Sequence, residues 1–400
     1  MTATDLPRLP FPTPDPLGLA PTLGPLREHA PVTRVRTRTG DEAWLVTGYA
    51  QVRSLLADPR LGRSHPEPEK AARLHDGVLL GGPMGDHEQE QASHQAMRRL
   101  LAPAFSARRM RRLTDHVGEL VDGMIDDLLA WERPADLHAA LAVPLPALVI
   151  CELLGVPYAD RDRFRAFSAQ VATMDDAEAS RAGMTALGEY MAGLLAVKRE
   201  SPGEDVLSDL LAAQREHPAL SDMAVTGLAA ALLFAGHETT VNRIDAGVLR
   251  LFPHDGGAAA LPDGPDEVAH AVEEILRLPV PGGGRGGGLI RYAREAVEVD
   301  GVVIAPGDAV VLSIGAANQD PAVFASPAEL DLHRAENPHL GFGHGAHHCV
   351  GASLARVELR AVFTALPARI PTLRVAVAPE ALRCREDSLT GGLLELPVTW

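Results

Sequence analysis

The sequence predicts a mainly α-helical protein with small β-sheets, folded as a single large domain over residues 1–400. Three observations support this prediction. Helical periodicity dominates up to about residue 278, a β-rich stretch appears only after Pro279, and neither a Ser-rich linker nor an internal repeat divides the chain. With 46% hydrophobic residues, a chain of 400 residues can bury a sizeable core.

The expected elements follow in order. The Pro-rich segment 1–25 is predicted to be extended, and 43–59, AWLVTGYAQVRSLLADP, predicts a strand followed by an amphipathic helix. The stretch 225–236, VTGLAAALLFAG, is apolar nearly all round, which predicts a helix buried on every side. Segment 297–318 contains two β-rich runs joined by a turn at Pro306–Gly307.

Two glycine-rich segments leave the local structure open. Segment 247–267 is rich in Gly and Pro, so its local order is doubtful. The run GGGRGGG at 282–288 is short for a flexible linker and offers little side-chain bulk. It fits a roomy cavity or a merely permissive loop.

Charge and cysteine content exclude several classes of protein. The formal net charge of -16 argues against sequence-independent nucleic-acid binding, which needs Lys and Arg to neutralise phosphates. Cys151, Cys349 and Cys384 form no C-x-x-C pair, which argues against a disulfide framework or a structural zinc site and fits a reducing cytosol. We see no signal peptide and no apolar run approaching the ~18 residues of a membrane span. We therefore expect a soluble, cytoplasmic monomer without a membrane partner.

The segment GFGHGAHHCVG at 341–351 combines glycines, histidines and one cysteine. Cys349 is followed by a helical pattern whose apolar positions share one face: Val350, Leu354, Val357 and Ala361. The thiol is therefore predicted at a helix N-terminus, where unpaired N–H groups favour a thiolate. Glycines at 343, 345 and 351 would let the backbone approach a bulky, flat group. Such a thiolate suits the axial position of haem iron.

This segment resembles the haem-binding loop of the cytochrome P-450 monooxygenases. The resemblance implies haem b with Cys349 as the axial iron ligand, His347 as a propionate contact, and Phe342 and Gly343 beside the cofactor. It extends over nearly the whole chain, through FPTPDPLG, LLADPRLGRS, LAPAFS, AANQDPAVF and LARVEL in preserved order. Bacterial, soluble members of the family are the most similar.

Two other interpretations of the loop have less support. Gly341-x-Gly343-x-x-Ala346 fits a dinucleotide fingerprint, but the preceding RAENPHL is polar and contains proline where a buried strand is needed. Zinc would need ligands that crowd too closely to converge on one tetrahedral centre: His344, His347, His348 and Cys349. No role follows for His344 or His348.

The sequence AGHETT, residues 235–240, follows the apolar stretch. An acid and a hydroxyl in an apolar helix are costly unless they are used or satisfied. The segment resembles the family's oxygen-activation motif, which implies that Glu238 and Thr239 relay protons to dioxygen while Ala235 and Gly236 leave room for it. Otherwise, the threonine would bond back to its own helix and the glutamate would pair with a neighbour. A zincin motif is excluded because position 241 is valine.

Further polar residues match supporting motifs of the family. Glu274 and Arg277 in AVEEILRL, with Arg334, resemble a buried network that holds the cysteine loop. Three residues match propionate contacts: His94 and Arg98 in SHQAMRRL, spaced i,i+4, and Arg291 in GLIRYA. Arg243 and Asp245 lie just past the chemistry on the apolar helix, where they would pair with their surroundings or touch a polar substrate.

Basic residues near the cysteine suggest how electrons arrive. The resemblance implies electrons from NAD(P)H through a ferredoxin reductase and a small acidic ferredoxin, steered by basic side chains on the cysteine side. The candidates are Arg108, Arg109, Arg111, Arg112, Arg356 and Arg360. A solvated helix face is the alternative interpretation of this cluster.

The resulting hypothesis is a haem-dependent monooxygenase that hydroxylates or oxidatively couples a small secondary metabolite. The first candidate is a cyclic dipeptide or other small peptide, with polyketides and terpenes as rivals. Four loops are expected to set the substrate: 62–90, 165–180, 282–290 and 390–396. The alternatives are a haem sensor or oxygen carrier without turnover, which would not need the acid–alcohol pair, and a nicotinamide-dependent enzyme.

Overall fold

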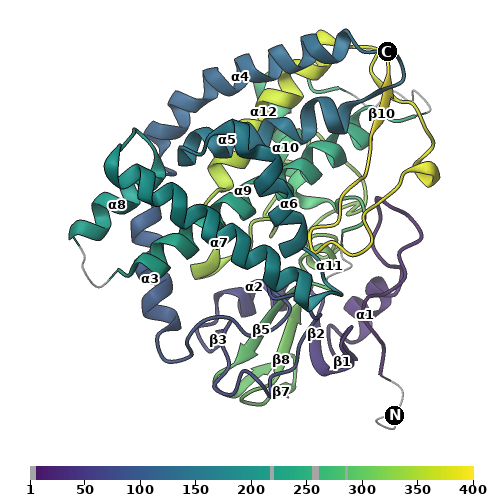
Figure 1. The fold of residues 1–400 in the computed structure, drawn as a ribbon. Coiled ribbons are helices and arrows are strands. Elements are labelled where there is room, and N and C mark those ends of the chain that lie inside the picture. Colours follow the sequence, from purple (N-terminus) through teal and green to yellow (C-terminus); the bar gives the residue numbers. More distant parts are fainter. Residues whose placement is uncertain (1–5, 217–219, 255–260, 284–286) are drawn as a thin grey trace.

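Helices occupy most of the molecule, and a small sheet lies along one edge (Figure 1). The computed structural model describes residues 6–216, 220–254, 261–283 and 287–400. The mainly α prediction is confirmed by the α-helices α1 (Leu23–His29), α2 (Tyr49–Ala57), α3 (Glu90–Leu101), α4 (Ala107–Leu129), α5 (Pro144–Leu154), α6 (Arg161–Val171), α7 (Ala177–Glu200), α8 (Val206–Glu216), α9 (Asp222–Leu251), α10 (Pro265–Arg277), α11 (Ile314–Ala317) and α12 (Ala352–Arg369). Single turns form η1 (His138–Ala142), η2 (Tyr158–Asp160), η3 (Gly345–His347) and η4 (Pro379–Ala381).

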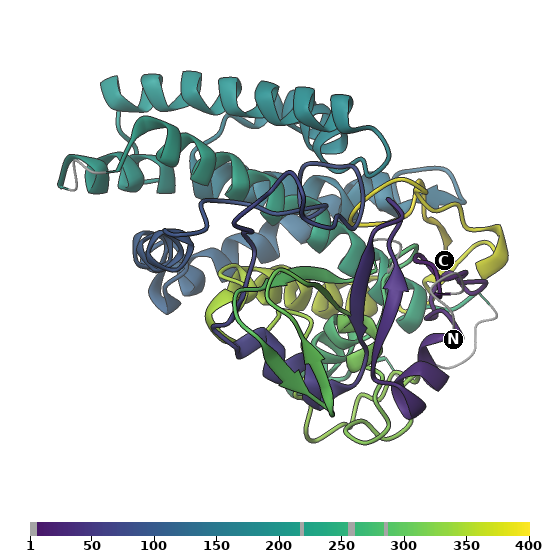
Figure 2. The ribbon, with the colours of Figure 1, turned by 90° about the horizontal axis from the view of Figure 1, so that it is seen from below.

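The strands form small sheets at the periphery (Figures 1 and 2). Their bounds are β1 (Val32–Arg36), β2 (Glu42–Val46), β3 (Leu61–Gly62), β4 (Ala135–Asp136), β5 (Leu289–Ala293), β6 (Val297–Val299), β7 (Val302–Ile304), β8 (Ala309–Leu312), β9 (Arg374–Val375) and β10 (Pro397–Thr399). The largest sheet has the order β1-β2-β8-β5-β3, with β2 and β8 parallel and its other neighbours antiparallel. The others are β4-β10-β9 and β6-β7.

Segment 297–318 differs from the sequence prediction of two β-rich runs. It forms three strands, because a tight turn at Asp300 and Gly301, both with positive φ, folds β6 against β7. The turn at Pro306–Gly307 then carries the chain from β7 to β8 in the larger sheet. The uncertain parts of the glycine-rich segments, 255–260 and 284–286, lie outside the described residues.

Helix α9 crosses the centre of the molecule and packs against α5, α7, α10 and α12 (Figure 1). The prediction that it is buried on every side is wrong for one stripe, because Ala231, Ala235 and Thr239 are accessible while the residues between them are mostly buried. Their i,i+4 spacing places them on one face. Helix α9 is also long and apolar enough to cross a membrane, contrary to our reading of the apolar runs, but half of its most apolar window is buried inside the protein.

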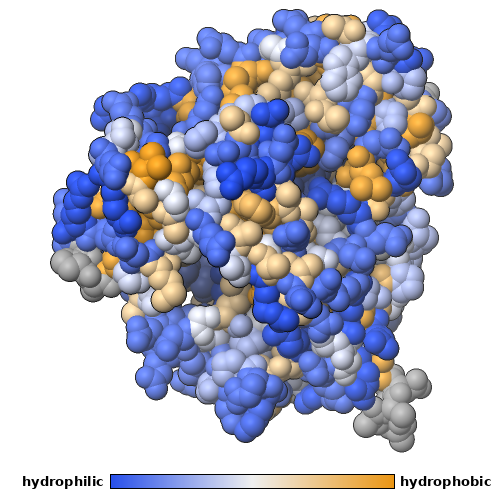
Figure 3. Space-filling model, viewed as in Figure 1, coloured by the Kyte–Doolittle hydropathy of each residue, from blue (hydrophilic) through white to orange (hydrophobic). Residues whose placement is uncertain are grey.

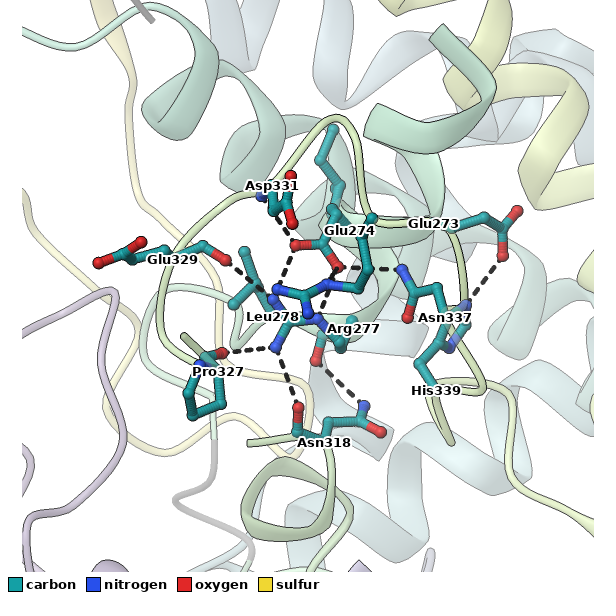
Figure 4. A network of polar contacts seen from close by, with 12 residues as sticks. Glu273, Glu274, Arg277, Leu278, Asn318, Pro327, Glu329, Asp331, Asn337 and His339 are labelled. Atoms are coloured by element: carbon teal, nitrogen blue, oxygen red, sulfur yellow. Dashed lines mark hydrogen bonds and ion pairs between the residues drawn. The ribbon is translucent and has the colours of Figure 1, made fainter. Parts of the chain in front are cut away.

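A buried ionic network joins α10 to the segment that precedes the cysteine loop (Figure 4). Glu274 accepts hydrogen bonds from Arg277 Nε at 2.6 Å and Arg334 Nε at 3.0 Å, and from Asn337 Nδ2 and the Asp331 backbone N–H. Arg277 also donates to the carbonyls of Asn318, Pro327 and Glu329. This network fixes the course of residues 327–337, which lead into the cysteine loop.

A second buried carboxyl group, Glu358 on α12, has no hydrogen-bond partner among the described residues and is 1% exposed. Burial raises its pKa well above the ordinary glutamate value, so the folded protein keeps it neutral. The unfolded chain ionises near pH 4.5 and releases a proton that the folded chain retains. The contribution of Glu358 therefore lowers the free energy of unfolding more and more as the pH rises above 4.5.

We expect Glu358→Met to raise the free energy of unfolding by about 1–3 kcal/mol at pH 8, and by clearly less at pH 5. Urea denaturation at both pH values measures the difference. Glu380→Gln, at an exposed position without a partner, serves as the control and should show no pH-dependent gain. If Glu358→Met raised the free energy of unfolding equally at pH 5 and pH 8, the conclusion that the buried Glu358 is neutral would be contradicted.

Figure 3 shows that hydrophilic residues cover most of the face seen in Figure 1, and that apolar residues form separate small patches there.

Candidate active site

Cys349 lies in a tight loop just before α12. Its backbone N–H donates to the Phe342 carbonyl at 2.9 Å, which closes the loop on itself. Phe342 packs under Arg356 of α12, whose guanidinium lies 4.7 Å from the ring centroid. Arg356 in turn donates to Glu273 at 2.7 and 2.8 Å. The loop is thus held between α10 and α12, with its thiol accessible on one side.

Opposing effects act on the thiol of Cys349. Burial raises the pKa of Cys349, although the Gly351 N–H and the charges of Arg98 and Arg356 act in the opposite direction. The predicted effect of the helix N-terminus is present through the Gly351 N–H, but burial outweighs it in the protein without a bound metal. Helix α12 begins at Ala352, three residues after the cysteine, so its first turn acts through Gly351 only. A bound metal cation would supply the missing stabilisation, because a coordinated thiol is deprotonated.

The backbone of the loop depends on its glycines in two ways. Gly343 and Gly345 have φ of 71° and 69°, a backbone conformation that favours glycine. A Cβ at Gly345 would lie 2.8 Å from the Cα of Ala57, so this glycine permits contact with α2. At Gly351 a Cβ would meet the Cys349 sulfur at an ordinary 4.0 Å. Contact with α2 thus accounts for Gly345, and the approach of these glycines to a flat ligand stays a prediction.

Three predicted residues from distant elements form one electropositive cluster. The rings of His94 on α3 and His347 in the loop lie 3.9 Å apart, and Arg291 extends from β5. Burial, with Arg63, His94 and Arg291 nearby, lowers the pKa of His347 to about 3. Burial, with Arg63 nearby, lowers the pKa of Arg291 to about 10. We call His94, His347, Arg291 and Arg63 the cationic cradle.

Arg63 was missed in the sequence. It follows β3 within LGRS, and its Nε is buried without a hydrogen-bond partner among the described residues. Glu90 is the carboxylate whose negative charge acts to raise the pKa values of Arg63, Arg291 and His347. It accepts hydrogen bonds from the backbone N–H groups of Arg63 and Ser64. Only its place within the motif LLADPRLGRS could have marked Arg63, because a single arginine after a short strand carries no other signal.

The cradle and the thiol together fit a haem. Arg63 and Arg291 carry the positive charge of the cradle beside the neutral ring of His347, and the Arg63 Nε has no hydrogen-bond partner among the described residues. Two propionate carboxylates would pair with these guanidinium groups. Arg98, predicted as another propionate contact, donates from Nη1 to the His348 carbonyl at 2.9 Å and so braces the cysteine loop. Its contact with a propionate stays a prediction. Among the described residues no group of three His, Cys, Asp or Glu could hold a metal ion, which leaves the zinc alternative without support. Residues 335–340 form no strand, so the dinucleotide fingerprint lacks its context.

The acid and the alcohol on α9 face different surroundings. Thr239 is accessible, and its Oγ1 donates to the Ala235 carbonyl of its own helix at 3.0 Å. Glu238 is 4% exposed and accepts from Arg385 Nη1 at 3.2 Å and from Thr390 Oγ1 at 2.8 Å. Both groups thus make the ordinary contacts expected without a catalytic role. An accessible hydroxyl beside a held carboxylate also remains suited to moving a proton.

Gly236 lies against α5. A Cβ at this position would lie 2.7 Å from Ile150 Cδ1, so the glycine allows α9 and α5 to approach closely, and its role beside dioxygen stays a prediction. Ala235 does lie on the accessible stripe.

The two charged residues farther along α9 are structural. Arg243 donates to the carbonyls of Ile275 and Leu278 at 2.7 and 2.6 Å and so caps the end of α10. Asp245 is fully buried and bonds His138 Nδ1 at 2.8 Å. Neither side chain is therefore available to a polar substrate.

Several of the predicted docking cations are already paired. Arg109 bonds Asp209 at 2.8 Å, Arg112 lies 3.7 Å from Glu204, and Arg356 is committed to Glu273. Among the described residues, the exposed arginines of α3, α4 and α12 without an ion-pair partner are Arg99, Arg108, Arg111 and Arg360. Arg99 was not predicted.

Comparisons with known proteins agree over the whole chain. The family model described as Cytochrome P-450 matches residues 268–376. Pentalenolactone synthase of Streptomyces exfoliatus is 44% identical over 400 residues, covering 99% of this chain and all of that protein. Nocardicin C N-oxygenase of Nocardia uniformis subsp. tsuyamanensis is 42% identical over 404 residues, with both chains covered in full. The solved structure of PimD, a polyene macrolide antibiotic pimaricin epoxidase, is 41% identical with a TM-score of 0.84, covering 99% of this chain and all of its own.

Proposed function

Because this chain belongs to the cytochrome P-450 family and is a monooxygenase, we propose that it oxidises an apolar secondary metabolite held against the accessible face of α9. The observation that carries the proposal is the stripe formed by Ala231, Ala235 and Thr239, which leads from an apolar surface to a hydroxyl. A haem sensor or oxygen carrier is not favoured, because the relatives are named for oxidative reactions.

The family implies a haem-thiolate cofactor, and bound haem supplies dioxygen activation and the insertion of one oxygen atom into the substrate. In this chain Cys349 would hold the iron through its sulfur, and the cationic cradle would hold the propionates. Arg98 and the Glu273–Arg356 pair position the loop that carries the sulfur. The network around Glu274 supports the same loop from the other side.

Proton handling would fall to Glu238 and Thr239. Thr239 Oγ1 donates to the Ala235 carbonyl, so it can accept a hydrogen bond on its lone pairs while it keeps that contact. Glu238 is an acceptor when ionised and can carry a proton when neutral. The carboxyl group would take up a proton at Oε1 or Oε2 and pass it toward the accessible side of α9.

The substrate class follows from the chemistry of the α9 stripe. Arg243, Asp245 and Glu238 are all occupied by protein partners, so the described part of α9 offers substrate no free charged group near Thr239. An apolar stripe favours a substrate with a large hydrocarbon surface. We propose a terpenoid lactone as the first candidate and a macrolide as the second. The cyclic dipeptide of the sequence hypothesis ranks third, because its amides would lack partners on this helix.

Optical titration of the purified protein with representatives of the three classes tests this proposal. The expected result is a haem Soret shift from low to high spin with a terpenoid lactone or a macrolide. Ala231→Phe places a bulky ring on the accessible face of α9, so it should abolish the Soret shift while the protein keeps its haem. The control Met223→Phe, at an exposed position, should keep the Soret shift. A shift with the cyclic dipeptide alone would contradict the apolar substrate, and a protein without a haem band would contradict the cofactor.

We propose that NAD(P)H supplies electrons through a ferredoxin reductase and an acidic ferredoxin that docks near the cysteine loop. The unpaired arginines Arg99 and Arg360 support this surface, because unpaired cations on an otherwise acidic protein steer an acidic partner.

The double variant Arg99→Glu, Arg360→Glu is expected to lower the rate constant for reduction by ferredoxin by about fivefold or more at low salt, because charge reversal at a rim slows association. Stopped-flow reduction at two ionic strengths measures it. Arg181→Glu on α7 is a matched control at another exposed arginine and should leave the rate unchanged. If the double variant were reduced at low salt as fast as the wild-type protein, docking at this surface would be contradicted.

A further inference from the structure

The carboxyl group of Glu238 is held by a segment far away in the sequence. Residues 384–393 fold against α9, and two of their side chains reach the acid. Arg385 Nη1 donates to Oε1 at 3.2 Å and Thr390 Oγ1 donates to Oε2 at 2.8 Å. We refer to residues 384–393 as the C-terminal loop.

Backbone contacts fix Thr390 at this place. Asn242, one turn beyond Glu238 on α9, donates from Nδ2 to the Thr390 carbonyl at 2.8 Å. The next residues turn sharply, with φ of 67° at Gly391 and 106° at Gly392. A Cβ at Gly392 would lie 2.2 Å from Asn242 Oδ1, so only glycine lets the loop approach α9 this closely. Thr390 is thus held against Glu238 by both helix and loop.

The hydroxyl of Thr390 continues to a second hydroxyl. Ser388 Oγ lies 3.0 Å from Thr390 Oγ1, and either atom could be the donor of an isolated pair. Thr390 has one hydroxyl hydrogen, however, and a carboxylate can only accept. Once Thr390 donates to Glu238, Ser388 must donate to Thr390. All donors therefore point the same way, from Ser388 through Thr390 to Glu238.

The outer end of this chain lies near solvent. Ser388 is 8% exposed, whereas the side chain of its neighbour Asp387 is 60% exposed. Glu238 is 4% exposed, so it has little direct contact with solvent. The hydroxyls therefore connect an acid that solvent barely reaches to the edge of the protein.

We propose that Ser388 and Thr390 form a hydroxyl relay that reprotonates Glu238 from solvent. The inference rests on the proposed function, in which Glu238 gives up a proton in each turnover. Thr390 passes its hydroxyl proton to Glu238 Oε2 and receives the proton of Ser388, which in turn takes up a proton that solvent supplies as hydronium. Each hydroxyl loses and gains one proton, so neither is consumed and no further reactant is needed. Thr390 also positions the carboxylate through the same hydrogen bond.

Replacing the two hydroxyls tests the relay in the haem-loaded enzyme. Thr390→Val and Ser388→Ala should each lower the rate of product formation on the order of tenfold, because a positioned proton donor is lost. They should also increase the solvent deuterium isotope effect, since proton delivery becomes more limiting. Thr390→Ser retains a hydroxyl and should restore both quantities. Thr114→Val removes a threonine hydroxyl that bonds only within α4, and should change neither.

A second measurement needs no haem. The infrared carboxylate band that disappears in Glu238→Gln identifies Glu238, and this band should shift in Thr390→Val protein and keep its position in Thr390→Ser. Wild-type rates and isotope effects in Thr390→Val and Ser388→Ala, together with a slowed Glu238→Gln enzyme, would overturn the relay and leave the proposed function intact. Full activity of Glu238→Gln would overturn the role of Glu238 itself.

Discussion

Replacing Cys349 by serine is expected to lower product formation below about 1% of the wild-type rate, because an alkoxide or alcohol ligand cannot donate electron density as a thiolate does. The loop itself should keep its course, since the closing bond comes from the backbone N–H of residue 349 and not from its sulfur. Folding and haem content should therefore change less than activity. Product formation and the optical spectrum of the carbon monoxide complex measure the two effects separately.

Cys384→Ser is the matched control, because Cys384 lies in the C-terminal loop and not in the loop that carries Cys349. It should keep the wild-type spectrum of the carbon monoxide complex. If Cys349→Ser kept that spectrum and Cys384→Ser lost it, the thiolate would have been assigned to the wrong residue.

Replacing Arg277 by alanine is expected to lower the free energy of unfolding by about 3–5 kcal/mol, because it leaves the Glu274 carboxylate buried without its principal counter-charge. Three carbonyls, of Asn318, Pro327 and Glu329, lose their donor in the same substitution. Urea denaturation of the haem-free protein isolates this effect from cofactor binding.

Arg383→Ala provides the comparison, since its pairing with Glu395 is exposed to solvent. That substitution should change stability by less than about 0.5 kcal/mol. If Arg277→Ala does not fold at all, Arg334→Ala removes only one of the donors to Glu274 and should show a smaller loss of the same kind. A loss in Arg277→Ala no larger than that of Arg383→Ala would contradict the structural role of the network.

The sequence was informative where a residue type has one physical reason to be present. The apolar run of α9, the strand and helix at 43–59, and the lone cysteine in a glycine-rich loop each predicted their place correctly. Glu274, Arg277 and Arg334 also came together as predicted, since isolated buried charges would be too costly.

Other features depended on distant contacts that local pattern does not encode. The sequence did not indicate that Gly236 packs against Ile150 or that Gly345 packs against Ala57. The arginine cluster at 108–112 suggested a free docking surface, yet Asp209 and Glu204 from the segment around α8 neutralise part of it. Helix α9 was predicted as uniformly buried because composition alone cannot show which face of a helix meets an internal surface.

The C-terminal loop has a consequence for how such an enzyme changes its substrate range. The same loop that holds Glu238 also bonds the segment between α6 and α7, through Met174 N–H to the Asp387 carbonyl and Leu389 N–H to the Ala172 carbonyl, and bonds the Pro281 carbonyl through Gly392 N–H. Substitutions that reshape those neighbouring segments would therefore shift the acid as well. Variants evolved at 172–174 or near 281 to accept new substrates should therefore consume more reducing equivalents without forming product. Position 231 lies on the accessible stripe and outside this loop. Substitutions there can change the substrate selectivity without increasing the consumption of reducing equivalents that yields no product.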